Sequence, residues 1–172
     1  MKAISIRSSA VSELPIPGAD PWFVHPDDPA SSVMTDFRVT ASITVPQSAQ
    51  IDVALEHMRH TGVRCALAID EQRRVVVGMI TAYDILGDLP MRHMHATSVP
   101  RSEVLVWQLM RRTADWAFLS YDDVETATVR TIARLFDDCG MTHLPVMNRD
   151  EGGTWRLRGL FSASKVRRLL QL

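Results

Sequence analysis

The stretch Gly78-Met79-Ile80-Thr81-Ala82-Tyr83-Asp84 decides how the rest of the chain is interpreted. Three valines at 75–77 precede it, and β-branched residues favour an extended strand. We therefore predict a strand that runs directly into a short helix, with Thr81 at the junction. A second copy of the pattern follows 81 positions later, at 159–165, where the sequence reads Gly-Leu-Phe-Ser-Ala-Ser-Lys. The first copy ends on an acidic residue and the second on a basic one, Lys165.

The two halves of the chain match element for element around these two copies. Each half is predicted to run strand, helix, glycine, strand, turn, strand and short helix. The first long helix, over 47–61, has apolar residues at i, i+3, i+4 and i+7 and ends before Gly62. Its counterpart, over 126–139, ends before Gly140. Self-similarity over a whole unit indicates an α+β fold built from two βαββα repeats.

Composition excludes several classes of protein. The 172 residues are 46% hydrophobic and 23% charged, with a net charge of −1, so the chain lacks the basic character of a dedicated nucleic-acid binder. Cys65 and Cys139 have neither zinc-type nor redox spacing, which favours a reducing compartment. The sequence shows no signal peptide and no apolar run near the ~20 residues of a membrane span. We expect a cytoplasmic protein with no membrane or nucleic-acid partner.

Residues 1–30 read as a proline-rich extension in which the spacing of the prolines excludes a regular helix. It contains the apolar trio 22–24, which predicts packing on the body or on a partner; a disordered leader is the alternative. The expected organisation is therefore an extension at 1–30, a first repeat at 31–89, a connector at 90–100 and a second repeat at 101–172.

On these residues the chain resembles the CBS domain family, named after cystathionine β-synthase, whose members occur as tandem pairs called Bateman modules. The family motif Gly-apolar-apolar-Thr/Ser-x-x-Asp is complete at 78–84. At 159–165 the Gly and Ser are kept, but Lys165 replaces the Asp. The resemblance covers about residues 31–172, and its other parts are Met34-Thr35, Gly62, Gly140 and Leu144-Pro145-Val146.

The resemblance implies a pseudo-twofold pair of repeats, with sheets facing each other, helices outside and two clefts between the repeats. It also implies a homodimer and an adenine-type ligand such as AMP, ADP, ATP or S-adenosylmethionine, without a required cofactor. In the family, the Thr or Ser contacts phosphate and the Asp contacts ribose hydroxyls, while the strand after the glycine lines the base pocket. Carried over, one candidate site is Val63, Arg64, Cys65, Thr81 and Asp84, and the other is Met141, Thr142, His143, Ser162 and Lys165.

The residues of the first site have two interpretations that the sequence leaves open. A helix N-terminus with the Thr81 hydroxyl suits a phosphate, and an ionised Asp84 suits a pair of ribose hydroxyls. The same spacing also resembles a capping box, in which the two side chains satisfy the first backbone N–H groups of the helix. A cap alone is worth about 1 kcal/mol and would account for both residues.

Lys165 points to a second cleft that differs from the first. A cation in the first turn of a helix is disfavoured by the helix dipole and cannot accept hydrogen bonds from ribose. The second cleft is therefore expected to bind a more anionic group, with Arg167 or Arg168 as further counter-charges. The alternative is that Lys165 reaches into solvent and that this cleft is empty.

No arrangement of residues indicates an enzyme, because the sequence contains no nucleophile–base pairing and no Walker-type glycine loop. Two histidine pairs, His57/His60 and His93/His95, lack a third ligand that would complete a metal site. We expect a regulatory module that senses an adenine nucleoside or nucleotide and acts on an effector protein in trans. The alternative is a ligand-independent dimerisation or scaffold protein with vestigial clefts.

Overall fold

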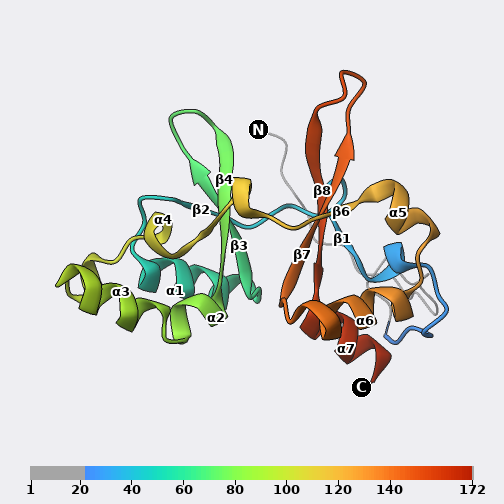
Figure 1. Ribbon diagram of the computed structural model, residues 1–172, viewed down its shortest axis with the longest axis horizontal. Coiled ribbons are helices and arrows are strands. Elements are labelled where there is room, and N and C mark those ends of the chain that lie inside the picture. Colours follow the sequence, from blue (N-terminus) through green and yellow to red (C-terminus); the bar gives the residue numbers. More distant parts are fainter. Residues whose placement is uncertain (1–21, 172) are drawn as a thin grey trace, which may run out of the picture.

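The computed structural model describes residues 22–171, which form two α/β halves standing side by side (Figure 1). The strands of the first half lie in the order β2-β3-β4-β5, with β2 (Thr44–Pro46), β3 (Cys65–Asp70), β4 (Val75–Thr81) and β5 (Arg111–Arg112). The strands of the second half lie in the order β1-β8-β7-β6, with β1 (Thr35–Asp36), β6 (Leu119–Ser120), β7 (His143–Arg149) and β8 (Trp155–Ser162).

Helices cover the outer face of each sheet, so that the two sheets face each other as expected (Figure 1). The first half carries α1 (Ile51–Thr61), α2 (Ala82–Leu86), α3 (Leu89–Thr97), the 3₁₀ turn η2 (Arg101–Glu103) and α4 (Val106–Leu109). The second half carries the 3₁₀ turn η1 (Ala30–Val33), α5 (Tyr121–Thr126), α6 (Val129–Cys139) and α7 (Ala163–Leu170). The 3₁₀ turn η3 (Thr113–Asp115) lies on the segment between β5 and β6.

The two long helices end as the sequence predicts, for a reason in the backbone. Gly62 and Gly140 adopt left-handed φ values of 70° and 64°, which only glycine reaches without steric cost. In α1, the residues at i, i+3, i+4 and i+7 from Ile51 are all buried, which fixes the face of the helix that packs on β3. The chain therefore turns sharply from each helix into the central strand of its sheet.

One of the two edge strands of each sheet comes from the part of the chain at the start of the other repeat. β1 pairs antiparallel with β8, and β5 pairs antiparallel with β4. Residues 22–36 thus belong to the second half, although they lie before and at the very start of the first repeat in sequence. The backbone N–H of Val24 donates to the carbonyl of Leu169 at 3.0 Å, and the N–H of Ala30 donates to that of Ala127 at 2.9 Å.

The apolar trio at 22–24 divides between surface and core. Val24 is buried in the core of the second half, whereas Trp22 and Phe23 are 89% and 50% exposed. Residues 1–21, on which most of the predicted extension falls, lie outside the described residues. β1 lies within the range expected for the first repeat and β5 within that expected for the second, and each joins the sheet of the other half.

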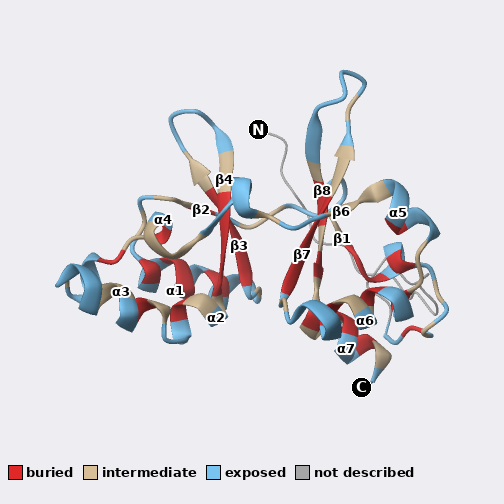
Figure 2. Ribbon diagram, viewed as in Figure 1, coloured by how far each residue is buried: buried red, intermediate tan, exposed pale blue. Residues whose placement is uncertain are grey.

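The connector after the first repeat is more helical than the sequence suggests. Pro90 reads as a helix terminator, but it occupies the first turn of α3, where the missing N–H costs nothing. Residues 101–109 form no continuous helix and contain only η2 and the short α4. Figure 2 shows buried residues concentrated where helices meet strands, while the tips of the β3–β4 and β7–β8 hairpins are exposed.

Apart from the core of each half, an apolar cluster lies between the two sheets and joins them. Its buried members, Cys65, Leu67 and Met79, come from β3 and β4 of the first half. Side chains of the second half pack against them, among them Leu157 and Leu160 of β8. Burying these side chains stabilises the contact between the two repeats. Three residues of the cluster, Cys65, Leu67 and Leu160, also line the candidate site.

Candidate ligand-binding cleft

A cleft of about 1330 Å³ lies between the two halves. Its lining comes from the segment between β1 and β2, from the start of β3, and from the junction of β8 with α7. The lining residues are Ser31, Met34, Thr35, Asp36, Phe37, Val39, Thr40, Ala41, Ile43, Gly62, Val63, Arg64, Cys65, Leu67, His143, Leu160, Ser162, Ser164, Lys165 and Arg168. Both repeats therefore contribute to one site.

The first half supplies the residues that follow the left-handed turn at Gly62. The carbonyl of Arg64 accepts the backbone N–H of Ala82 at 2.9 Å, which ties the start of β3 to the start of α2. The exposed guanidinium of Arg64 donates to the Tyr83 hydroxyl at 3.2 Å. This contact places a positive charge beside the cleft while leaving it accessible to solvent.

The second half supplies two hydroxyls and two cationic side chains from the start of α7. Ser162 and Ser164 hydrogen-bond to each other through their hydroxyls at 3.0 Å, and Ser162 makes no side-chain cap to the helix. Lys165 and Arg168 are three residues apart, which puts them on the same face of α7. Arg167 points elsewhere, because its guanidinium pairs with Asp137 at 2.9 Å outside the cleft.

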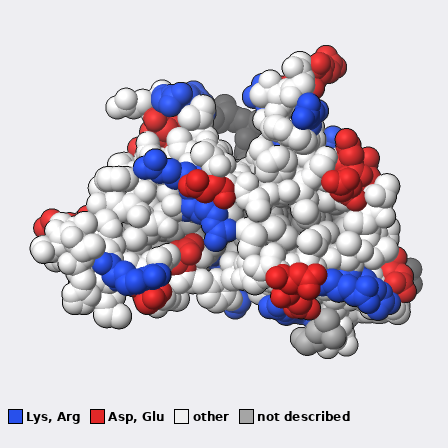
Figure 3. Space-filling model, in the orientation of Figure 1, with Lys and Arg blue, Asp and Glu red and all other residues white. Residues whose placement is uncertain are grey.

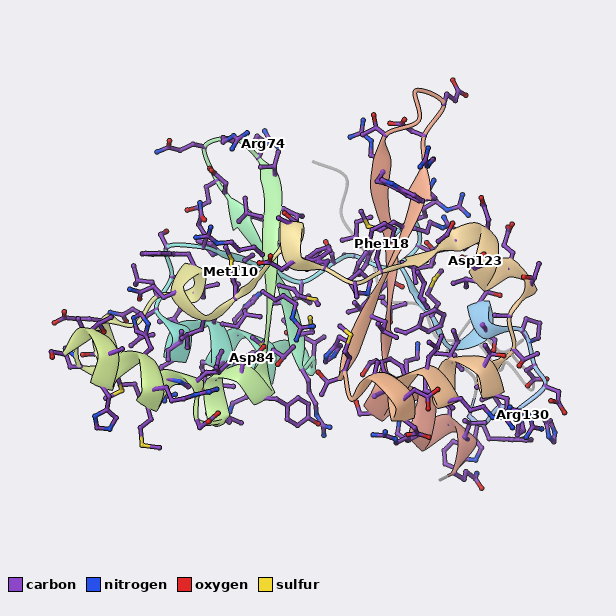
Figure 4. The ribbon with its side chains drawn as sticks, in the orientation of Figure 1. Arg74, Asp84, Met110, Phe118, Asp123 and Arg130 are labelled. Carbon is purple, nitrogen blue, oxygen red and sulfur yellow. The ribbon has the colours of Figure 1, made fainter. Side chains whose placement is uncertain are left out.

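Thr81 and Asp84 bind each other rather than facing the cleft. The Thr81 hydroxyl and its backbone N–H both donate to Asp84 Oδ2, at 2.7 and 2.8 Å. The Asp84 N–H donates in return to Thr81 Oγ1 at 3.1 Å, which completes a capping box on α2. Both residues are absent from the cleft lining, and Figure 4 shows Asp84 within the half that carries β2–β5.

His143 and Cys65 are buried groups at the meeting point of the two halves. Burial lowers the pKa of His143 to about 4; nearby Asp84 opposes this shift and Arg64 adds to it. Its Nδ1 lies 3.1 Å from the Thr142 hydroxyl. Burial, assisted by the charge of Asp84, raises the pKa of Cys65 to about 12. At neutral pH the cleft therefore presents a neutral imidazole and a protonated thiol.

The structure brings together residues that the sequence assigns to two separate sites. Val63, Arg64 and Cys65 of the first set share one cleft with His143, Ser162 and Lys165 of the second. Thr81, Asp84, Met141 and Thr142 are not among its lining residues. Sequence reasoning missed Ser164 as a lining residue and the wall from Thr35 to Ile43. Ser164 could have been found from its position between Ser162 and Lys165, whereas the wall has no local signal.

Other kinds of site find no support in the described residues. Within residues 22–171, no group of three or more His, Cys, Asp or Glu side chains could hold a metal ion. No helix in this range is long and apolar enough to cross a bilayer. Acidic and basic side chains are interspersed on the face shown in Figure 3, without a broad area of one sign.

Comparison with known proteins gives a family match for one segment of the chain and solved structures of similar fold. Residues 30–90 match the family model of the CBS domain, and no curated protein matches the chain. In structure, the chain is similar to CBSX2 of Arabidopsis thaliana, a CBS-pair protein, with 20% identity and a TM-score of 0.52 over 83% of this chain and 93% of that one. A structure of CBSX2 in complex with AMP gives 22% identity and a TM-score of 0.54 over 82% and 94%. An uncharacterised conserved protein of Pyrococcus horikoshii gives 19% and 0.56 over 83% and 92%.

Proposed function

We propose that this chain, which has the fold of a tandem CBS-domain protein, senses an adenine nucleotide in the cleft between its halves. In this proposal the module is non-catalytic and regulates an effector protein in trans, as a cytoplasmic homodimer. The observation that supports it best is the composition of the cleft wall. Cationic side chains of both halves, Arg64 on one side and Lys165 and Arg168 on the other, line the same space.

The cleft offers complementary surfaces for the two ends of a nucleotide. Cationic groups and the hydroxyls of Ser162 and Ser164 suit phosphate oxygens, which accept hydrogen bonds. Apolar side chains such as Leu67 and Leu160 suit the face of an adenine base. A relative of this fold, CBSX2, has been solved in complex with AMP, which supports an adenine nucleotide as the class of ligand.

Regulation would follow from the position of the ligand between the halves. A nucleotide that touches Arg64 and Arg168 together bridges the first and second halves. Such a ligand favours whichever arrangement of the halves places these groups at the right distance. The shift in arrangement would then be read by the effector protein.

A ligand-independent scaffold is the second candidate, and one observation favours it. The complete copy of the family motif, at 78–84, uses Thr81 and Asp84 to cap α2. The residues that would bind ribose and phosphate in that copy therefore already have a structural role. If the cationic cleft also binds nothing, the chain would act through its dimer surface alone.

A thermal-shift panel with AMP, ADP, ATP, NAD and S-adenosylmethionine distinguishes the two candidates. A true ligand well above its dissociation constant should add about 2–4 kcal/mol of apparent stability. The matched variants are Arg168→Ala, which removes a cationic lining residue, and Arg167→Ala, which removes its exposed neighbour paired with Asp137. Arg168→Ala should weaken nucleotide binding about tenfold, and Arg167→Ala should leave it unchanged. The absence of a shift with every compound would favour the scaffold.

A further inference from the structure

The cleft contains one carboxylate among its described lining residues, that of Asp36. An ionised carboxylate on the wall of an anion site repels phosphate, and at an effective dielectric constant of about 20 this repulsion is appreciable over several ångströms. A cleft suited to anions therefore needs a way to neutralise Asp36.

Each oxygen of the Asp36 carboxylate has a partner, one through an ion pair and the other through a backbone hydrogen bond. Oδ2 lies 2.9 Å from Arg158 Nη2, and Oδ1 accepts the backbone N–H of Arg38 at 2.9 Å. The Asp36 side chain is 22% exposed, so it borders the cleft without being free to rotate. The side chain of Arg38 is a poor counter-charge, because its Nε is 3.9 Å away and it is 72% exposed.

Arg158 is a buried charge with few other partners. It is 4% exposed, and its guanidinium lies 4.4 Å over the ring of Tyr121. Within the described residues, its Nε and Nη1 have no hydrogen-bond partner. Asp36 is thus the ionic partner that compensates this cation. Burying an incompletely satisfied arginine is costly, which calls for a reason beyond packing.

Holding β1 against β8 does not by itself explain the ion pair between Arg158 and Asp36, because backbone hydrogen bonds already hold these strands together. β1 pairs with β8 through Thr35 opposite Leu160 and Asp36 opposite Gly159. The N–H of Phe37 also donates to the carbonyl of Arg158 at 3.0 Å. Arg158 sits where the pairing of β8 with β7 shifts register, between the positions that pair with Met147 and Val146, and its guanidinium lies against Asp36. The ion pair therefore neutralises the charge of Asp36 on a strand, β1, that backbone pairing already holds in place.

We propose that Arg158 is a positioning residue that makes the cleft selective for anionic ligands by neutralising Asp36 and holding its carboxylate away from them. The inference rests on the proposed function only in taking the cleft as the ligand site. It does not require that the ligand contain adenine.

The test measures binding of inorganic triphosphate, ATP and adenosine by calorimetry to the full chain and four variants. Arg158→Met leaves Asp36 uncompensated and should weaken triphosphate and ATP about tenfold, with adenosine changed less than about twofold. Asp36→Asn/Arg158→Met removes both charges and should restore triphosphate binding to within about threefold. Arg158→Lys keeps the positive charge and should retain most of the binding.

Asp36→Asn alone keeps the inference testable if Arg158→Met does not fold. It leaves the cation behind the wall, so triphosphate should bind as tightly as to wild type or more tightly. Equal weakening of triphosphate and adenosine in Asp36→Asn or Arg158→Met would show a merely structural pair and overturn the inference. Failure of the double variant to recover, or a wild-type protein that binds no triphosphate, would overturn it as well. A wild-type protein that binds triphosphate but neither ATP nor adenosine refutes the adenine ligand, while the comparison of variants still decides the role of Arg158.

Discussion

Asp84 Oδ2 accepts two hydrogen bonds from one residue, Thr81, through its hydroxyl at 2.7 Å and its backbone N–H at 2.8 Å. At the equivalent junction of the second half, Ser162 makes no cap to α7 and hydrogen-bonds to the hydroxyl of Ser164 instead. The two copies of one motif thus use their hydroxyls differently. One ties the start of a helix together, and the other lines the cleft.

This difference predicts unequal costs for removing the two hydroxyls. Thr81→Ala should lower the free energy of unfolding by about 1–2 kcal/mol, because it removes the cap of α2. Ser162→Ala, the matched control, should cost less than about 0.5 kcal/mol. Urea denaturation of both variants measures the difference. Equal costs would mean that the cap contributes nothing beyond the loss of a hydroxyl.

The protein should lose stability as the pH is lowered, because folding lowers the pKa of His143. Its pKa is about 4 in the folded protein and near its ordinary 6.5 when unfolded, so the unfolded chain binds the extra proton first. The stabilisation is complete above about pH 6.5, is lost as the pH falls toward 4, and amounts to at most about 3 kcal/mol. Denaturation between pH 7.5 and 4.5 checks this, with His143→Asn as the variant that should flatten the dependence. The charges of Asp84 and Arg64 also act on the pKa of His143, so the same scan should be run on Asp84→Asn to separate its contribution.

The two cysteines should differ in reactivity toward thiol reagents. Cys65 is buried and its pKa is raised to about 12, so almost none of it is thiolate at pH 8. Cys139 is exposed. Iodoacetamide should therefore modify the native protein once, at Cys139, and the denatured protein twice, as peptide mass spectrometry would show. Native labelling of Cys65 at a similar rate would mean that the interface between the halves opens readily.

Gly159 should resist substitution because of close packing rather than backbone conformation. A Cβ at this position would lie 2.5 Å from the carbonyl oxygen of Thr35 and 3.2 Å from the sulfur of Met34. Gly159→Ala should therefore displace β1 from β8, lower the free energy of unfolding by about 1–3 kcal/mol and disturb the cleft wall. Gly152→Ala, in the exposed hairpin turn where the nearest atom is at 3.4 Å, should cost much less. Thermal denaturation of the two variants provides the comparison.

Local patterns in the sequence predicted the features that depend on neighbouring residues. The helix predicted over 47–61 forms at 51–61, and its terminating glycine is as predicted. The sequence also offered the capping interpretation of Thr81 and Asp84. The facing sheets came from the resemblance to a family of paired repeats. The helix and the cap could be predicted because each depends on residues close together in the sequence.

Features that depend on contacts between residues distant in sequence could not be predicted from local patterns. β1 and β5 are two residues long each, too short for any periodic pattern, so their pairing across the repeats could not be predicted. The pairing of β1 with β8 also sets the position of Thr35 and Asp36, which line the cleft. Arg158 looked like an ordinary strand residue, because its partner Asp36 is brought to it only by the folded sheet.

The exchange of edge strands makes the two repeats interlocked rather than merely adjacent. Removing residues up to 36 would destabilise the carboxy-terminal half first, because β8 would lose its pairing with β1. The backbone N–H and C=O groups on that edge of β8 would then be unpaired and exposed to solvent. Such an edge invites strand addition from another molecule. A fragment that contains one repeat alone should therefore expose an unpaired strand edge and aggregate more readily than the whole chain.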